Sequence, residues 1–191
     1  GGIAANSTGI TLSETTPVAG VGHLVVAGVT ASAKLIVAQL LNATTVRGVY
    51  FRLRRTAAFT AKMYIFYGIT TNYGSIYVGT DDLIHVEATR DGGDSCVSTT
   101  TVPTSGSIEV LIVGNNTKTW IFVNGTQEAY AAAAAPSFDD NGTSSNWFKD
   151  NPASGMPGAS LHITDMIAVG SSASTDTPDN IQWPRLKVAA Q

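Results

Sequence analysis

The sequence predicts an all-β protein built as an antiparallel two-sheet sandwich or jelly roll. Short apolar runs recur along the 191 residues, separated by clusters of Gly, Pro, Asn, Asp and Ser. Helical periodicity is almost absent, so no long helices are available to connect parallel strands. A sandwich of this length is most simply one domain, and we expect a single unit over residues 1–191.

The first strands are predicted from GHLVVAGVTA, ASAKLIVAQLL and GVYFRLRR. The second run, over residues 31–41, also fits an apolar helical stripe, but a buried strand is the favoured interpretation. In the third run, alternation places Val49, Phe51 and Leu53 on one face. The arginines at positions 52, 54 and 55 are expected to be solvated, with an acidic partner as the alternative.

The middle strands are predicted from KMYIFYGI, GSIYVGT and DLIHVEATR. In the first of these runs, strict alternation places Met63, Ile65 and Tyr67 opposite Tyr64 and Phe66.

The run DLIHVEATR predicts an inward face containing Ile84 and Val86, and an outward face containing His85 and Glu87. GSIEVLIVG and TWIFVNG follow as two strands of a hairpin, and Asn124-Gly125 predicts a tight turn after the second.

The last third of the chain is less regular. AYAAAAAP fits either a short helix or a strand. A long loop is predicted over 137–158, and loops of this length are usually functional or bound to a partner. SLHITDMIAVG and IQWPRLKVA are the closing strands.

Composition excludes several classes of function. A net charge of −3 and an isoelectric point near 5.5 argue against nucleic-acid binding. No apolar run approaches the roughly 20 residues that span a bilayer. Cys96 is the only cysteine, so it has no disulfide partner within the chain and is expected to be a buried or incidental thiol. The first residues lack a signal peptide and a Met, which predicts a processed terminus or a fragment.

The stretch GSIEVLIVGNNTKTWIFVNGTQEAY resembles the laminin G-like, concanavalin A-like lectin family. In that family a short loop is followed by a strand of the Trp-apolar-Phe-Val-Asn-Gly type. MIAVGSS and DNIQWPRLKV are similar to the family's closing strands, so the resemblance covers roughly residues 106–191. It implies a concanavalin A-like sandwich, of the kind also found in virus and phage structural proteins.

Family members that bind calcium use acidic loop residues. The loops DGGD and DDNG offer Asp91, Asp94, Asp139 and Asp140 as candidate calcium ligands. Calcium requires six to eight oxygens, and Gly and Asp are also common turn residues, so the turn interpretation is favoured. We therefore expect no cofactor, with calcium as the alternative.

An enzyme is not expected. The chain lacks the Glu-x-Asp-x-Glu strand of family members that hydrolyse β-glucans, and it shows no zinc-binding or Gly-x-Ser-x-Gly motif. Glycosidases need two carboxylates about 5–10 Å apart. Glu87 and Glu109 lie on predicted strands and are the remaining pair that could meet in one cleft.

Two groups of residues are candidates for ligand or subunit contact, because aromatic rings beside amide and hydroxyl groups suit sugars. The first group lies in the long loop and consists of Asn146, Trp147, Phe148 and Asp150. The second group lies in TNYGSIY and consists of Tyr73 and Tyr77. For Trp147 and Phe148, anchoring of the loop or of a neighbouring subunit is the favoured role. Trp120 and Trp183 are expected in the core.

Only 13% of residues are charged, about half the usual share, and no catalytic motif is present. These features favour a structural protein of a virus or phage particle, such as a capsid-decorating or fibre domain acting through other subunits. The alternative is a carbohydrate-binding adhesion or receptor-binding module with surface glycans as partners. Either interpretation predicts a virion or extracellular location.

Overall fold

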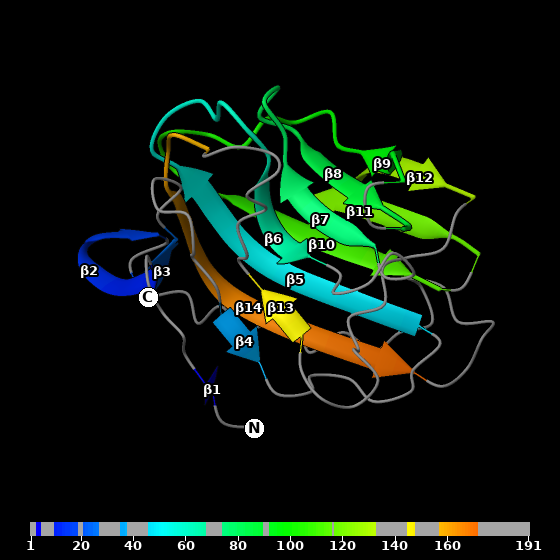
Figure 1. Ribbon diagram of the computed structural model, residues 1–191, viewed down its shortest axis with the longest axis horizontal. Coiled ribbons are helices and arrows are strands. Elements are labelled where there is room, and N and C mark those ends of the chain that lie inside the picture. The colour runs from blue at the N-terminus through cyan, green and yellow to red at the C-terminus, as the bar shows by residue number, and fades with distance from the viewer. Residues whose placement is uncertain are drawn as a thin grey trace.

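A computed structural model of the chain describes residues 3–4, 10–18, 21–26, 35–37, 46–67, 74–89, 92–115, 117–132, 145–147 and 157–171. These residues form two antiparallel sheets packed face to face, which confirms the predicted β-sandwich (Figure 1). No α-helix occurs in these ranges. The described residues accordingly contain no helix that is long and apolar enough to cross a membrane.

Sheet A has seven strands in the described structure. In spatial order they are β1 (Ile3–Ala4), β4 (Leu35–Val37), β13 (Ser145–Trp147), β6 (Met63–Tyr67), β7 (Ser75–Val78), β8 (Ile84–Glu87) and β9 (Asp94–Val97). The strand at Leu35–Val37 agrees with the strand interpretation of residues 31–41. The predicted long loop over 137–158 is interrupted by β13, which pairs with β4 and β6.

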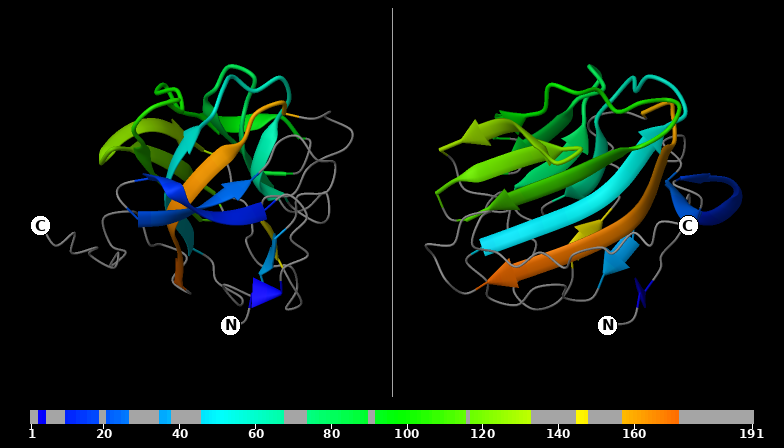
Figure 2. Two further views of the ribbon diagram at one scale, coloured as in Figure 1. Left: turned by 90° about the vertical axis from the view of Figure 1, so that its left-hand side faces the viewer. Right: turned by 180° about the vertical axis from the view of Figure 1, so that it is seen from behind.

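Sheet B also has seven described strands. In spatial order they are β12 (Thr126–Ala131), β11 (Thr119–Val123), β10 (Ile108–Gly114), β5 (Val46–Arg55), β14 (Leu161–Ser171), β3 (Val21–Val26) and β2 (Ile10–Val18). The long strands β5 and β14 run side by side through its middle (Figure 2). The start of AYAAAAAP belongs to β12, whereas the strand predicted at IQWPRLKVA lies outside the described residues.

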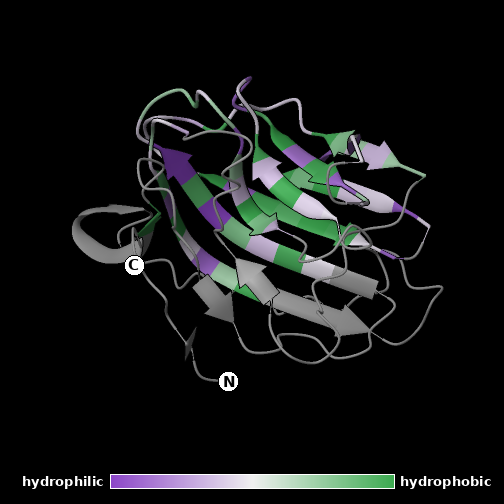
Figure 3. Ribbon diagram, in the orientation of Figure 1, coloured by the Kyte–Doolittle hydropathy of each residue, from purple (hydrophilic) through white to green (hydrophobic). Residues whose placement is uncertain are grey.

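The core lies between the sheets and is filled by alternate residues of each strand. Val49, Phe51 and Leu53 of β5 are fully buried there, as their alternation predicts. Figure 3 shows the resulting stripes of hydrophobic and hydrophilic residues along β5. Sheet A supplies the opposite wall with Ile76, Val78, Ile84 and Val86, among others.

A β-bulge in β6 overturns one predicted face. Tyr64 pairs with Tyr77, but Phe66 pairs with Ile76, so β6 holds one extra residue there. Phe66 consequently packs in the core, whereas Tyr67 joins Tyr64 on the other face of sheet A. The strict alternation that placed Tyr67 on the same face as Met63 and Ile65 was therefore wrong.

The predicted Asn-Gly hairpin joins β11 and β12. Asn124 and Gly125 have φ angles of 48° and 79°, the left-handed conformations of a type I′ turn. Asn124 also ties the turn to β10, because its side-chain Oδ1 accepts the Glu109 N–H at 2.9 Å and its backbone N–H donates to the Glu109 carbonyl at 2.9 Å.

Candidate ligand-binding site

The outer face of sheet A, turned away from the core, carries polar and aromatic side chains. On β7, Ile76 and Val78 face the core, so Tyr77 projects from the opposite side. On β8, His85 and Glu87 occupy the equivalent outer positions. Their outward direction agrees with the alternation of the sequence, but His85 is only 8% exposed and Glu87 is fully buried. Side chains of this type are rarely buried without a partner.

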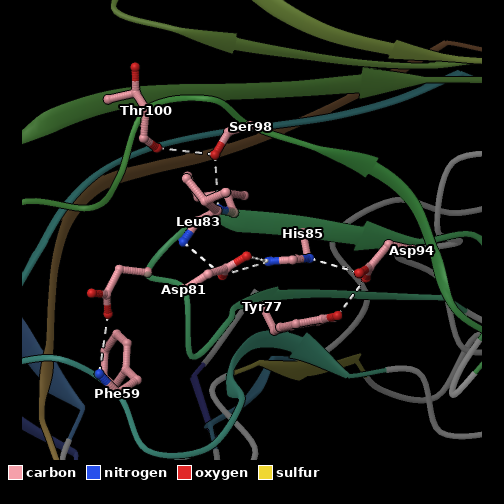
Figure 4. Close-up of polar contacts among 10 residues, drawn as sticks. Phe59, Tyr77, Asp81, Leu83, His85, Asp94, Ser98 and Thr100 are labelled. Atoms are coloured by element: carbon pink, nitrogen blue, oxygen red, sulfur yellow. Dashed lines mark hydrogen bonds and ion pairs between the residues drawn. The ribbon is translucent and has the colours of Figure 1, made fainter.

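A hydrogen-bonded network connects these strands (Figure 4). Tyr77 and His85 face each other across β7 and β8, and their rings stack with centroids 4.8 Å apart. The Tyr77 hydroxyl donates to Asp94 Oδ1 at 2.5 Å. His85 Nδ1 lies 2.9 Å from Asp94 Oδ2, and His85 Nε2 lies 2.9 Å from Asp81 Oδ1. One imidazole therefore joins two carboxylates.

The network shifts the pKa values of Asp81 and Tyr77. Burial alone would raise the pKa of Asp81, but hydrogen bonds from His85 and from the Leu83 N–H lower it below the ordinary value. Burial and the hydrogen bond to Asp94 raise the pKa of Tyr77, so its hydroxyl remains a donor. A neutral imidazole has one N–H, so both His85 nitrogens can donate only when the ring is protonated.

Lys62 adds a cation beside this network. Its Nζ lies 2.8 Å from Glu87 Oε1 and 4.1 Å from the centroid of the Tyr77 ring. The Lys62 side chain is 35% exposed, whereas that of Glu87 is 1% exposed. Burial lowers the pKa of Lys62, but the hydrogen bond and the charge of Glu87 outweigh it, and the pKa is raised. Lys62 is therefore the neutralising partner of a buried carboxylate.

A pocket of about 400 Å³ opens over these side chains. Its wall is formed by Thr60, Ala61, Lys62, Tyr77, Gly79, Thr80, Asp81 and His85. The Asp81 side chain is 48% exposed, so a carboxylate is accessible beside an ammonium and the hydroxyls of two exposed threonines. The arrangement can accept and donate hydrogen bonds at neighbouring points.

The tight turn between β7 and β8 positions Asp81. The Gly79 N–H donates to the Leu83 carbonyl at 2.9 Å, and the Asp82 N–H donates to the Gly79 carbonyl at 3.0 Å. The Leu83 N–H donates to Asp81 Oδ1 at 3.1 Å. A Cβ at Gly79 would lie 2.5 Å from Asp81 Oδ1 and 2.6 Å from His85 Nε2, so the close approach requires glycine.

Of the candidate residues from the sequence, Tyr77 and Asp94 meet in this network. Asn146 and Trp147 lie in β13 of the same sheet, where Trp147 pairs with Phe66 of β6. The remaining candidates, Tyr73, Phe148, Asp150, Asp91, Asp139 and Asp140, lie outside the described residues. The roles assigned to all of these residues stay predictions.

The calcium interpretation is weakened at Asp94, because both of its carboxylate oxygens already bind Tyr77 and His85. Within the described ranges, no group of three or more His, Cys, Asp or Glu side chains is arranged to hold a metal ion. The absence of a cofactor therefore stays an expectation.

Lys62 and Asp81 were missed by sequence reasoning. A usable signal was present in YVGTDDLIH: a short turn at GTDD places Tyr77 and His85 opposite each other, and brings Asp81 back towards the histidine. Lys62 could not be found in this way, because its approach to Glu87 spans three strands of sheet A.

The acids Glu87 and Glu109 do not share a cleft. Glu87 lies on the outer face of sheet A, bonded to Lys62. Glu109 lies between the core residues Ile108 and Val110 on β10, and therefore on the outer face of sheet B, 2.5 Å from Arg52. The suggestion that these two carboxylates could flank one glycosidic bond is wrong.

The expectation of a solvated arginine face is also wrong, because each arginine has a partner within the chain. Arg52 binds Glu109 and, at 3.6 Å, Asp165. Arg54 lies 3.2 Å from His162 Nδ1. Arg55 binds Asp82 at 2.8 Å and the Val102 carbonyl at 2.6 Å.

An apolar cluster lies on part of the outer face of sheet B. Trp120 is buried against Val113, with Leu111 and Phe122 beside them, in a cluster separate from the core between the sheets. The predicted burial of Trp120 is confirmed, but the expectation that it lies in the core between the sheets is wrong. Trp183 lies outside the described residues. A small pocket of about 160 Å³ is lined on this face by Tyr50, Glu109, Leu111, Phe122 and Gly125.

The two packed antiparallel sheets define a β-sandwich. No protein-family model matches the sequence, and no curated protein matches it. Among solved structures, the binding domain of Paraclostridial Mosquitocidal Protein 1 is similar, with a TM-score of 0.62 and 9% identity over 87% of this chain and 43% of that one. The present chain thus spans less than half of that protein's length.

Two further solved structures with this fold are a domain in complex with a trisaccharide and an enzyme of a polysaccharide lyase family. Domain 4 of AbnA, an extracellular arabinanase from Geobacillus stearothermophilus in complex with arabinotriose, has a TM-score of 0.59 and 13% identity over 84% of this chain and 77% of that one. The alginate lyase AlgAT5 has a TM-score of 0.51 and 13% identity, covering 78% of each chain.

At such low identity these similarities show the fold alone. None of the three descriptions refers to a virus or a phage. The virion role, the oligomeric assembly and the location of the protein therefore stay predictions from sequence.

Proposed function

We propose that this protein is a non-catalytic glycan-binding module, and that its binding site is the pocket on the outer face of sheet A. The observation that carries the proposal is that the exposed Asp81 carboxylate and the Lys62 ammonium both line one pocket of about 400 Å³. This is the carbohydrate-binding alternative indicated by the sequence.

Sugars present hydroxyl groups that both donate and accept hydrogen bonds. A carboxylate accepts from two neighbouring hydroxyls, and an ammonium donates to hydroxyl oxygens, so the two side chains together complement a diol. Thr60 and Thr80 add hydroxyls at the rim. The Tyr77 ring is 3% exposed and is already stacked on His85. It therefore contributes an apolar surface in the pocket wall, and it does not provide a free platform for stacking.

A binding role fits better than catalysis for the described residues. The exposed carboxylate of Asp81 has a lowered pKa, and a general acid for glycoside hydrolysis needs a raised one. The fold supports the proposal as well, because binding domains and a domain complexed with arabinotriose are built on it.

Binding can be tested with a panel of immobilised plant, microbial and animal glycans. Wild-type protein, Asp81→Ala and Glu109→Gln would be compared, since Glu109 is a partly exposed carboxylate on the opposite outer face. We expect wild type and Glu109→Gln to bind the same glycans, with binding by Asp81→Ala weakened at least tenfold. The proposal would be overturned if wild type bound no glycan, or if both variants were weakened equally.

A further inference from the structure

We infer that the sheet A pocket selects uncharged glycans and rejects sugars that carry a carboxylate. This inference rests on the proposed function and names the class of ligand. It is carried by the distribution of charge around the pocket and by the partners that each cation already has.

Among the described residues, carboxylates outnumber cations in and beside the pocket. Asp81, Glu87 and Asp94 face one ammonium, that of Lys62, and the imidazole of His85. Even with His85 protonated, these groups sum to a negative charge. The Asp81 and Asp94 side chains are 48% and 35% exposed, so their charges are felt by a ligand that enters.

Lys62 is not available to neutralise an acidic ligand. Its ammonium lies 2.8 Å from the carboxylate of Glu87, which is 1% exposed. If Lys62 turned towards a ligand carboxylate, it would give up this ion pair with a buried carboxylate, which is unfavourable. Lys62 can donate a further hydrogen bond to a hydroxyl without leaving Glu87, because an ammonium has three N–H groups.

The other cations near the pocket are engaged in the same way. Both nitrogens of His85 face aspartate oxygens at 2.9 Å. Arg55 binds Asp82 at 2.8 Å, and its side chain is 13% exposed. Asp82 lies in the turn beside Asp81. A sugar carboxylate in this pocket would therefore meet Asp81 with no uncommitted cation among the described residues.

The test compares oligosaccharides that differ only by oxidation of C6. Isothermal titration calorimetry of the full chain would use mannotriose against trimannuronate, and galactotriose against trigalacturonate, at 20 mM and 500 mM NaCl. We expect the neutral member of a bound pair to bind at least tenfold more tightly at 20 mM salt. The ratio should shrink at 500 mM salt, because salt screens the charge of the half-exposed Asp81.

Asp81→Asn supplies the second measurement, because it keeps the shape of the side chain and removes its charge. We expect the ratio at 20 mM salt to fall at least threefold in this variant and to stay unchanged in Glu109→Gln. An acidic trisaccharide that binds as tightly as its neutral partner would refute the inference and leave the proposed function standing. Failure of all four sugars and of the wider glycan panel to bind would refute both.

Discussion

Replacement of Lys62 by Met should destabilise the protein through Glu87. The Met side chain retains most of the apolar stem of Lys62 but removes the ammonium 2.8 Å from a carboxylate that is 1% exposed. Removing one partner of a buried pair costs about 3–5 kcal/mol. Lys62 is itself 35% exposed, so water hydrates part of the site, and we expect a smaller cost of about 2–3 kcal/mol.

Thermal and urea unfolding of the full chain would measure this change. For a chain of this length, about 2–3 kcal/mol corresponds to a Tm lower by roughly 4–12 °C. Lys118→Met is the matched control, because Lys118 is exposed in the loop between β10 and β11, and its replacement should change Tm by less than about 2 °C.

A double-mutant cycle with Glu87→Gln separates the pair from the individual side chains. The double variant should be more stable than the sum of the single changes predicts, by at least about 1 kcal/mol, because it leaves no unpaired charge. A Lys62→Met protein within about 0.5 kcal/mol of wild type, or additive single changes, would refute the reasoning.

Three further predictions follow from individual contacts. Gly79→Ala should push Asp81 away from His85 and weaken glycan binding at least tenfold. NMR of the His85 ring nitrogens would report the change in this contact. Burial alone would raise the pKa of Glu128, but hydrogen bonds from Thr100 lower it. The stabilisation that Glu128 contributes is therefore complete above its ordinary pKa of 4.5, and it is lost as the pH falls through the lowered pKa. Glu128→Gln should therefore show a shallower acid loss of Tm. Burial raises the pKa of Cys96 to about 11, so a thiol reagent at pH 8 should modify it only in urea.

Most of the fold could be predicted from the sequence because strand faces follow a period of two. This rule places the core residues of β5, β7 and β8 correctly. It fails in β6, where a bulge moves Phe66 to the core face, because nothing in MYIFY distinguishes a bulge from regular alternation. The Asn124-Gly125 turn was predictable, because both residues favour the left-handed conformation that it requires.

The candidate site was predictable only in part. Tyr77 and Asp94 were singled out separately, as an aromatic residue and as a loop carboxylate, but their hydrogen bond joins β7 to β9, which are not neighbours in the sheet. The ion pair between Lys62 and Glu87 likewise crosses over β7. Such contacts depend on the relative register of three strands. The periodicity within one strand carries no information about that register.

The buried network has a physical consequence for binding. Buried charged groups are weak contributors to stability compared with apolar packing, so their presence on the outer face of sheet A needs another explanation. The contacts run in sequence from Tyr77 through Asp94 and His85 to Asp81, whose carboxylate is also held by the Leu83 N–H. An exposed carboxylate is thereby restrained before any ligand arrives. Restraining a free side chain on binding costs about 0.5–1.5 kcal/mol, and a preorganised Asp81 avoids that cost. Residues that never touch the ligand would thus contribute to its affinity.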